Sequence, residues 1–122
     1  MAAYNLFPEQ VETAVYKHVR SYYYRNSAYI GYYRENGNLG EIDVVVDYPG
    51  GRILIEVKYR ESYSLDVKAA IVAEAGKSTS ALLITKTEND FGPLQSDKAI
   101  YKIPAYAFLY LLGHAERHAF AY

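Results

Sequence analysis

The chain has 122 residues, 51% of them hydrophobic, with no cysteine and a formal net charge of −1 from 13 basic and 14 acidic side chains. This size favours a single domain over residues 1–122, and the missing cysteines exclude disulfides and thiolate zinc sites. No run is long enough to span a membrane and no signal-peptide core is present, so we expect a cytoplasmic protein without membrane contact. The balanced charge argues against a dedicated nucleic-acid binder but leaves room for a local basic patch.

The first predicted element is a helix that begins at Phe7-Pro8-Glu9, where a proline and an acid suit the first turn. Residues 1–6 before it are expected to be loose. The helix carries an apolar stripe at helical spacing, formed by Val11, Ala14, Val15, Val19 and Tyr22. Glu12 lies at the edge of this stripe and is, by pattern alone, a solvated helix acid.

Arginines and tyrosines interleave at the end of this helix and beyond it. The chain has 15 tyrosines, which cluster at 16–33 and 101–110, and Arg20, Arg25 and Arg34 lie within or beside the first cluster. Basic and aromatic side chains together can hold nucleic acid through phosphate contacts and base stacking. An equally good interpretation is a helix end and an edge strand that tyrosines pack together.

A meander of three strands is predicted next. Residues 28–34 read as the first strand and 35–40 as its hairpin turn. Valine and isoleucine dominate 42–46 and 53–57, which suits two further strands, and Pro49-Gly50-Gly51 marks the tight turn between them.

The second hairpin gathers charged residues. We assume that it closes with Asp47 opposite Arg52. Asp43 then lies opposite Glu56 on the same face, which Lys58 also shares, because side chains alternate along each strand. Charge is costly to bury unless it is paired or binds a metal. Composition alone favours an ion pair between Lys58 and one of the acids, and the alternative is a Mg²⁺ site, which takes one or two protein carboxylates.

The second half of the chain alternates between helix and strand. A helix is expected over 65–75 and a buried strand over 80–85. A polar loop at 87–97 then leads to a short strand at 99–103.

The last predicted helix begins at Pro104 and ends at Leu112, with Gly113 as its cap and residues 114–122 as a loose tail. Its residues are apolar on nearly every side, which is more apolar surface than a small domain easily buries. We therefore expect self-association, as a two-fold homodimer.

These elements predict an α/β fold with a core at about residues 8–112. A central mixed β-sheet is flanked by helices on both sides, because strands that are apolar on both faces need cover on both faces.

The spacing of Asp43 and the tripeptide Glu56-Val57-Lys58 resembles the D…ExK signature of the PD-(D/E)XK nuclease superfamily. A longer ordered set resembles the nuclease-like C-terminal domains of archaeal and bacterial AAA-type ATPases, over about residues 11–112. This set consists of VETAV at 11–15, EID at 41–43, IEVK at 55–58, LIT at 83–85 and IPAYAFL at 103–109.

The resemblance implies a restriction-endonuclease-like core and a DNA phosphodiesterase that depends on Mg²⁺ or Mn²⁺. Asp43 and Glu56 would hold the metal, with help from Glu12 and from the backbone carbonyl of Val57. Lys58 would position or activate the attacking water.

Two other functions stay open at this point. The chain could be a catalytically inactive nuclease-like module that contacts a partner protein or an AAA-type ATPase, which the balanced charge and the many tyrosines favour. It could also bind nucleic acid without cleaving it. The ATPase module of the similar proteins is absent from this chain, so we expect either an excised C-terminal domain or a stand-alone version.

Overall fold

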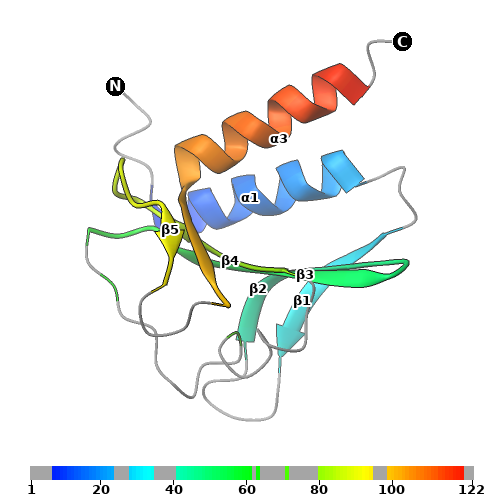
Figure 1. Ribbon diagram of the computed structural model, residues 1–122, viewed down its shortest axis with the longest axis horizontal. Coiled ribbons are helices and arrows are strands. Elements are labelled where there is room, and N and C mark those ends of the chain that lie inside the picture. Colours follow the sequence, from blue (N-terminus) through cyan, green and yellow to red (C-terminus); the bar gives the residue numbers. More distant parts are fainter. Residues whose placement is uncertain are drawn as a thin grey trace.

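The computed structural model describes residues 7–23, 28–34, 41–61, 63, 71, 80–94 and 99–119 (Figure 1). Its elements are, in order, α1 (Pro8–Tyr23), β1 (Tyr29–Arg34), β2 (Glu41–Tyr48), β3 (Gly51–Lys58), β4 (Ser80–Thr85), β5 (Gly92–Pro93), β6 (Tyr101–Pro104) and α3 (Ala105–Ala119). Among the described residues, no helix is long and apolar enough to cross a membrane.

Within the described residues, the strands form one six-stranded sheet in the order β1-β2-β3-β4-β6-β5. β1, β2 and β3 pair antiparallel as a meander. β4 pairs parallel with β3, β6 pairs parallel with β4, and β5 pairs antiparallel with β6. The sheet is mixed and flanked by helices, which confirms the predicted fold class. The carboxyl ends of β3, β4 and β6 consequently meet at one edge of the sheet.

α1 and α3 lie side by side over one face of the sheet (Figure 1). Val11, Val15 and Val19 recur at helical spacing on α1, and all three are buried against the sheet. The same core cluster contains Val44, Val46, Ile55, Val57, Ile84, Ala105 and Phe108. Because side chains alternate along a strand, the β2 and β3 residues between these point to the opposite face.

A second core cluster lies on that opposite face. It contains Ile42, Val45, Leu54, Ile71, Ala81, Leu83 and Ile100. Ile71 is helical and fully buried, and it belongs to the helix predicted at 65–75, whose other residues lie outside the described ones. The burial of Ile71 fits the expectation that both faces of the sheet are covered.

The hairpin of β2 and β3 closes in the predicted register. Asp47 pairs with Arg52, and Arg52 Nε lies 2.7 Å from Asp47 Oδ1. Gly50 in the turn has a φ of 97°, in the left-handed region that glycine adopts without strain. The prediction of this register is confirmed, and the register brings Asp43 beside Glu56.

Two parts of the C-terminal half differ from the predictions. Gly92–Pro93 pairs with β6 as β5, where the sequence predicts a polar loop, because two residues are too few to show strand alternation. α3 runs on to Ala119, so the predicted helix end at Leu112 is wrong. Residues 114–119, predicted as part of a loose tail, are helical. A glycine inside a helix costs only about 1 kcal/mol relative to alanine, and the helix-forming residues after Gly113 outweigh it.

The position of Gly113 inside α3 gives a prediction about stability. A Cβ added to Gly113 would meet nothing within 4 Å. Gly113→Ala should therefore raise the free energy of unfolding by about 0.5–1 kcal/mol through helix propensity alone. Gly50→Ala is the matched control, since it also has open space but requires a φ of 97°, and it should lower stability by about 1 kcal/mol. Urea titrations measure both changes, and a loss of stability in Gly113→Ala would contradict a continuous α3.

Candidate functional site

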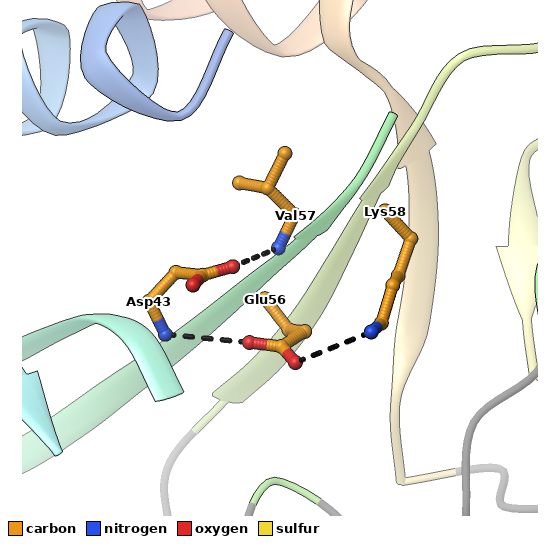
Figure 2. Close-up of polar contacts among 4 residues, drawn as sticks. All are labelled: Asp43, Glu56, Val57 and Lys58. Atoms are coloured by element: carbon orange, nitrogen blue, oxygen red, sulfur yellow. Dashed lines mark hydrogen bonds and ion pairs between the residues drawn. The ribbon is translucent and has the colours of Figure 1, made fainter. Parts of the chain in front are cut away.

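The candidate site lies where β2 leaves β3. The backbone pairing that starts at the turn reaches Val44 and Ile55, and Asp43 and Glu56 come one step further. There the side chains replace the strand ladder (Figure 2). The Asp43 N–H donates to Glu56 Oε1 at 3.3 Å, and the Val57 N–H donates to Asp43 Oδ2 at 2.8 Å. Each acid accepts a hydrogen bond from the backbone of the opposite strand, so the two carboxyl groups are drawn together.

β2 follows an irregular course at this point. Ile42 and Val45 both lie in the second core cluster, although strict alternation would put residues three apart on opposite faces. The neighbouring strand β1 shifts its register between Gly31 and Tyr33, beside the same part of β2. Irregularities of this kind bend a strand and interrupt its pairing, and they are common next to functional sites.

Lys58 lies beside Glu56, on the side away from Asp43 (Figure 2). Val57 belongs to the core cluster under α1 and α3, so Glu56 and Lys58 point to the other face of the sheet (Figure 2). Lys58 Nζ lies 3.9 Å from Glu56 Oε2, and the two side chains are 25% and 12% exposed. The structure thus brings together Asp43, Glu56 and Lys58, the three residues of the predicted pattern.

The surroundings of Glu56 favour its protonated form. Burial, the negative charge of Asp43 and a side-chain hydrogen bond with Asp43 raise the pKa of Glu56 from 4.5 to about 8, and the charge of Lys58 offsets only part of this rise. At neutral pH Glu56 therefore keeps its proton, which spares this corner a second negative charge beside the ammonium of Lys58. This protonation explains how two acids and a lysine share a half-buried corner of the sheet.

The structure does not bring Glu12 into a three-carboxylate group. Glu12 lies half-buried on α1. In the described part of the chain, no three His, Cys, Asp or Glu side chains are grouped so that they could hold a metal ion. The Val57 carbonyl, in contrast, lies on the Asp43 side of β3, because the N–H and C=O of one strand residue point to the same neighbouring strand.

Of the three predicted nucleic-acid-binding arginines, Arg20 is the one whose side chain the structure describes, and it lies away from the acid pair. Arg20 lies exposed in the last turn of α1. That end of α1 faces the turn of the hairpin, where Tyr23 lines a shallow hollow with Tyr48, and the acid pair lies at the other end of the hairpin. Arg34 falls in β1 but its side chain lies outside the described ones, and Arg25 lies outside the described residues altogether.

A second polar group, which the sequence analysis missed, lies at the neighbouring strand ends. We call it the Asp90 cluster, and it consists of Tyr63, Thr85, Asp90 and Lys102. The Tyr63 hydroxyl donates to Asp90 Oδ2 at 2.5 Å, and Lys102 Nζ lies 2.8 Å from Asp90 Oδ1. Tyr63 and Asp90 follow β3 and β4, and the carboxyl ends of parallel strands are where α/β proteins place their sites, which is the signal that could have found them.

The raised pKa of Glu56 makes stability depend on pH. Between pH 4.5 and about 8 the folded chain keeps a proton that the unfolded chain has lost. The stability that this proton contributes is therefore fully present below pH 4.5 and is lost as the pH rises to about 8. Relative to Glu56→Gln, the free energy of unfolding of the wild type should fall between about pH 5 and about pH 8.5, by at most about 1.4 kcal/mol per pH unit.

Denaturant titrations at several pH values, without divalent metal, measure this difference. Asp47→Asn is the matched control, since Asp47 is an exposed acid on the same hairpin, paired with Arg52. It should shift stability by about 1 kcal/mol or less, without a trend over this pH range. A constant difference between wild type and Glu56→Gln would show that Glu56 is ionised throughout and would contradict its raised pKa.

The chain matches a known domain family over most of its length. Residues 9–106 match the family described as "Domain of unknown function (DUF4143)". This segment runs from the first turn of α1 to the first turn of α3, so it includes the whole sheet, the acid pair and the Asp90 cluster. No curated protein and no solved structure matches the chain. The chain therefore belongs to the DUF4143 domain family.

Proposed function

We propose that the chain is a divalent-metal-dependent DNA phosphodiesterase of the PD-(D/E)XK type, with Mg²⁺ or Mn²⁺ as its cofactor. The observation that carries the proposal is the meeting of Asp43 and Glu56 at the point where β2 leaves β3, with Lys58 beside them. An ion pair alone needs one acid and one base. A second acid in the same corner adds repulsion, which a proton on Glu56 relieves in the absence of metal and which a bound cation would relieve in its place.

The atoms present fit a hard divalent cation. The carboxylates of Asp43 and Glu56 would hold it, together with the Val57 carbonyl on the same side of β3. Mg²⁺ usually takes one or two protein carboxylates and completes its coordination with water and substrate phosphate, so a third acid is not required. When bound, the metal would polarise a phosphate and lower the pKa of a coordinated water.

Lys58 has a separate task in this proposal. Its ammonium lies 3.9 Å from Glu56 and is partly exposed, so it can reach a phosphate held at the pair. There it stabilises the negative charge that develops on the phosphate and orients the attacking water. An ammonium is not a metal ligand, so the loss of Lys58 should affect cleavage and spare metal binding.

Metal binding should appear as thermal stabilisation. We expect the melting temperature of the wild type to rise with Mn²⁺ and, more weakly, with Mg²⁺, by the equivalent of about 2.7 kcal/mol when the metal is a hundredfold above its Kd. Asp43→Asn and Glu56→Gln should each abolish this rise and the metal-dependent cleavage of DNA. Lys58→Ala should keep the rise and lose the cleavage.

Asp47→Asn again serves as the control, because it removes an acid from the same hairpin outside the pair. It should keep both the rise and the cleavage. A wild type that is stabilised by metal but cleaves no form of DNA would be an inactive relative of the nucleases. A wild type that shows neither effect would reduce Asp43, Glu56 and Lys58 to an ion-pair cluster.

A second candidate function is contact with a partner protein, and an apolar surface on α3 favours it. Tyr106, Tyr110 and Leu111 are 55%, 65% and 54% exposed. Large apolar side chains exposed together mark association surfaces more often than single ones do. The partner that we propose is a second copy of the chain, and the resemblance to ATPase-linked domains offers an AAA-type ATPase module as the alternative.

Sedimentation velocity at micromolar concentration tests this second candidate. The wild type should sediment as a dimer, and Tyr110→Lys should shift it toward monomer, because a buried charge at the contact is costly. Tyr29→Lys changes another exposed tyrosine, which lies on β1, and should leave the dimer intact. A wild type that stays monomeric at every concentration would remove the homodimer and leave only the contact with another protein.

A further inference from the structure

The Asp90 cluster holds a lysine at a defined position near the acid pair. Lys102 comes from β6, Asp90 from the loop after β4, and Tyr63 from the segment after β3. Burial opposes the ionisation of Asp90, but the hydrogen bonds from Lys102 and Tyr63 lower its pKa overall, so Asp90 is a carboxylate at neutral pH. Lys102 is therefore held by a charged partner that is itself fixed by a tyrosine.

Thr85 is the fourth member of the cluster and lies at its buried side. Its side chain is fully buried, and it lies near enough to Asp90 to help lower the pKa of that acid. The hydroxyl oxygen nevertheless has no partner of good hydrogen-bond geometry within the described residues. The buried side of the cluster is thus polar, although the residues next to Thr85 on β4 belong to the hydrophobic core.

The strand register places Lys102 on the same face of the sheet as the acid pair. Glu56 is aligned with Leu83 on β4, and Leu83 is aligned with Lys102 on β6. Aligned residues of parallel strands point to the same face. Lys58 is aligned with Thr85 in the same way. Two strand spacings, about 10 Å in total, separate the backbones at Glu56 and Lys102.

That separation suits two phosphates of one nucleic-acid strand. Neighbouring phosphates of one strand rise about 3.4 Å along the axis of a duplex and also step around it, so about 10 Å is covered by fewer than three nucleotides. The side chain of Lys102 is 20% exposed, and an ammonium has three N–H donors, of which Asp90 needs one. A lysine held in place in advance also loses less freedom when it binds.

We propose that Lys102, held by Asp90 and Tyr63, binds a phosphate of the DNA backbone a few nucleotides from the phosphate that a cation at Asp43 and Glu56 would hold. The proposal rests on the proposed function, because it assumes that DNA lies across this face of the sheet. It assigns the Asp90 cluster to substrate binding, where a purely structural ion pair would only join β4 to β6.

Binding of a short fluorescein-labelled DNA duplex, followed by fluorescence anisotropy at several salt concentrations in EDTA, tests the proposal without any metal. Lys102→Gln should weaken binding roughly three- to tenfold at ~0.1 M salt and lower the salt slope by about 1. Tyr63→Phe keeps the ammonium but releases Asp90, so it should weaken binding less and leave the slope unchanged.

Lys86→Gln is the matched control. Lys86 is also a partly exposed lysine paired with an acid, Glu61, but it lies over the ring of Tyr59, which packs on the α1–α3 face of the sheet. The Lys86→Gln variant should bind DNA as the wild type does. Equal effects of Lys102→Gln and Lys86→Gln would overturn the proposal, and so would a wild type that binds no DNA in EDTA.

The DNA-binding test of Lys102 can be distinguished from the tests of metal binding and cleavage. Lys102→Gln lies outside the acid pair, so it should keep the stabilisation by Mn²⁺ that the wild type shows. If Lys102→Gln weakens DNA binding while the wild type shows neither metal stabilisation nor cleavage, the phosphate contact stands and the phosphodiesterase fails. If the metal stabilises the wild type and DNA is cleaved, but Lys102→Gln binds DNA as the wild type does, the phosphodiesterase stands and the phosphate contact of Lys102 fails.

Discussion

The hydrogen bonds that Asp43 and Glu56 exchange with the opposing strand determine the character of this protein's site. They take over at the position where β2 and β3 stop pairing through their backbones, and they satisfy backbone N–H groups that the divergence would leave unpaired. The same contacts bring two acids together in a half-buried corner. The end of the backbone pairing between β2 and β3 therefore also brings Asp43 and Glu56 together. The raised pKa of Glu56, beside Lys58, follows from this arrangement.

The sequence was sufficient to predict the parts of the structure that depend on local patterns. Alternation along β2 and β3 and the glycine turn between them lead to the observed register, and with it to the contact between Asp43 and Glu56. The stripe of α1 and the apolar run of β4 are local patterns of the same kind. The end of α3 was predicted wrongly because Gly113 fits a helix cap and a helix interior almost equally well.

The parts that could not be predicted depend on contacts between distant segments. The rule that sites lie at the carboxyl ends of parallel strands points to Tyr63 and Asp90, but their contact with Lys102 depends on the parallel pairing of β3, β4 and β6, which no periodicity in the sequence shows. For the same reason the sequence could not show that Arg20 lies toward the hairpin turn, away from the acid pair. The second finding removes Arg20 from the proposed DNA contact, which we place at Lys58 and Lys102.

The central proposal is that the acid pair is a cation site in which Glu56 keeps its proton when no cation is bound. Calorimetric titration of the protein with Mn²⁺ at neutral pH, in buffers of different ionisation enthalpy, counts the protons released as the metal binds. The account predicts binding of one ion with release of about one proton, and loss of both in Glu56→Gln. Binding without proton release, or no binding at all, would contradict it.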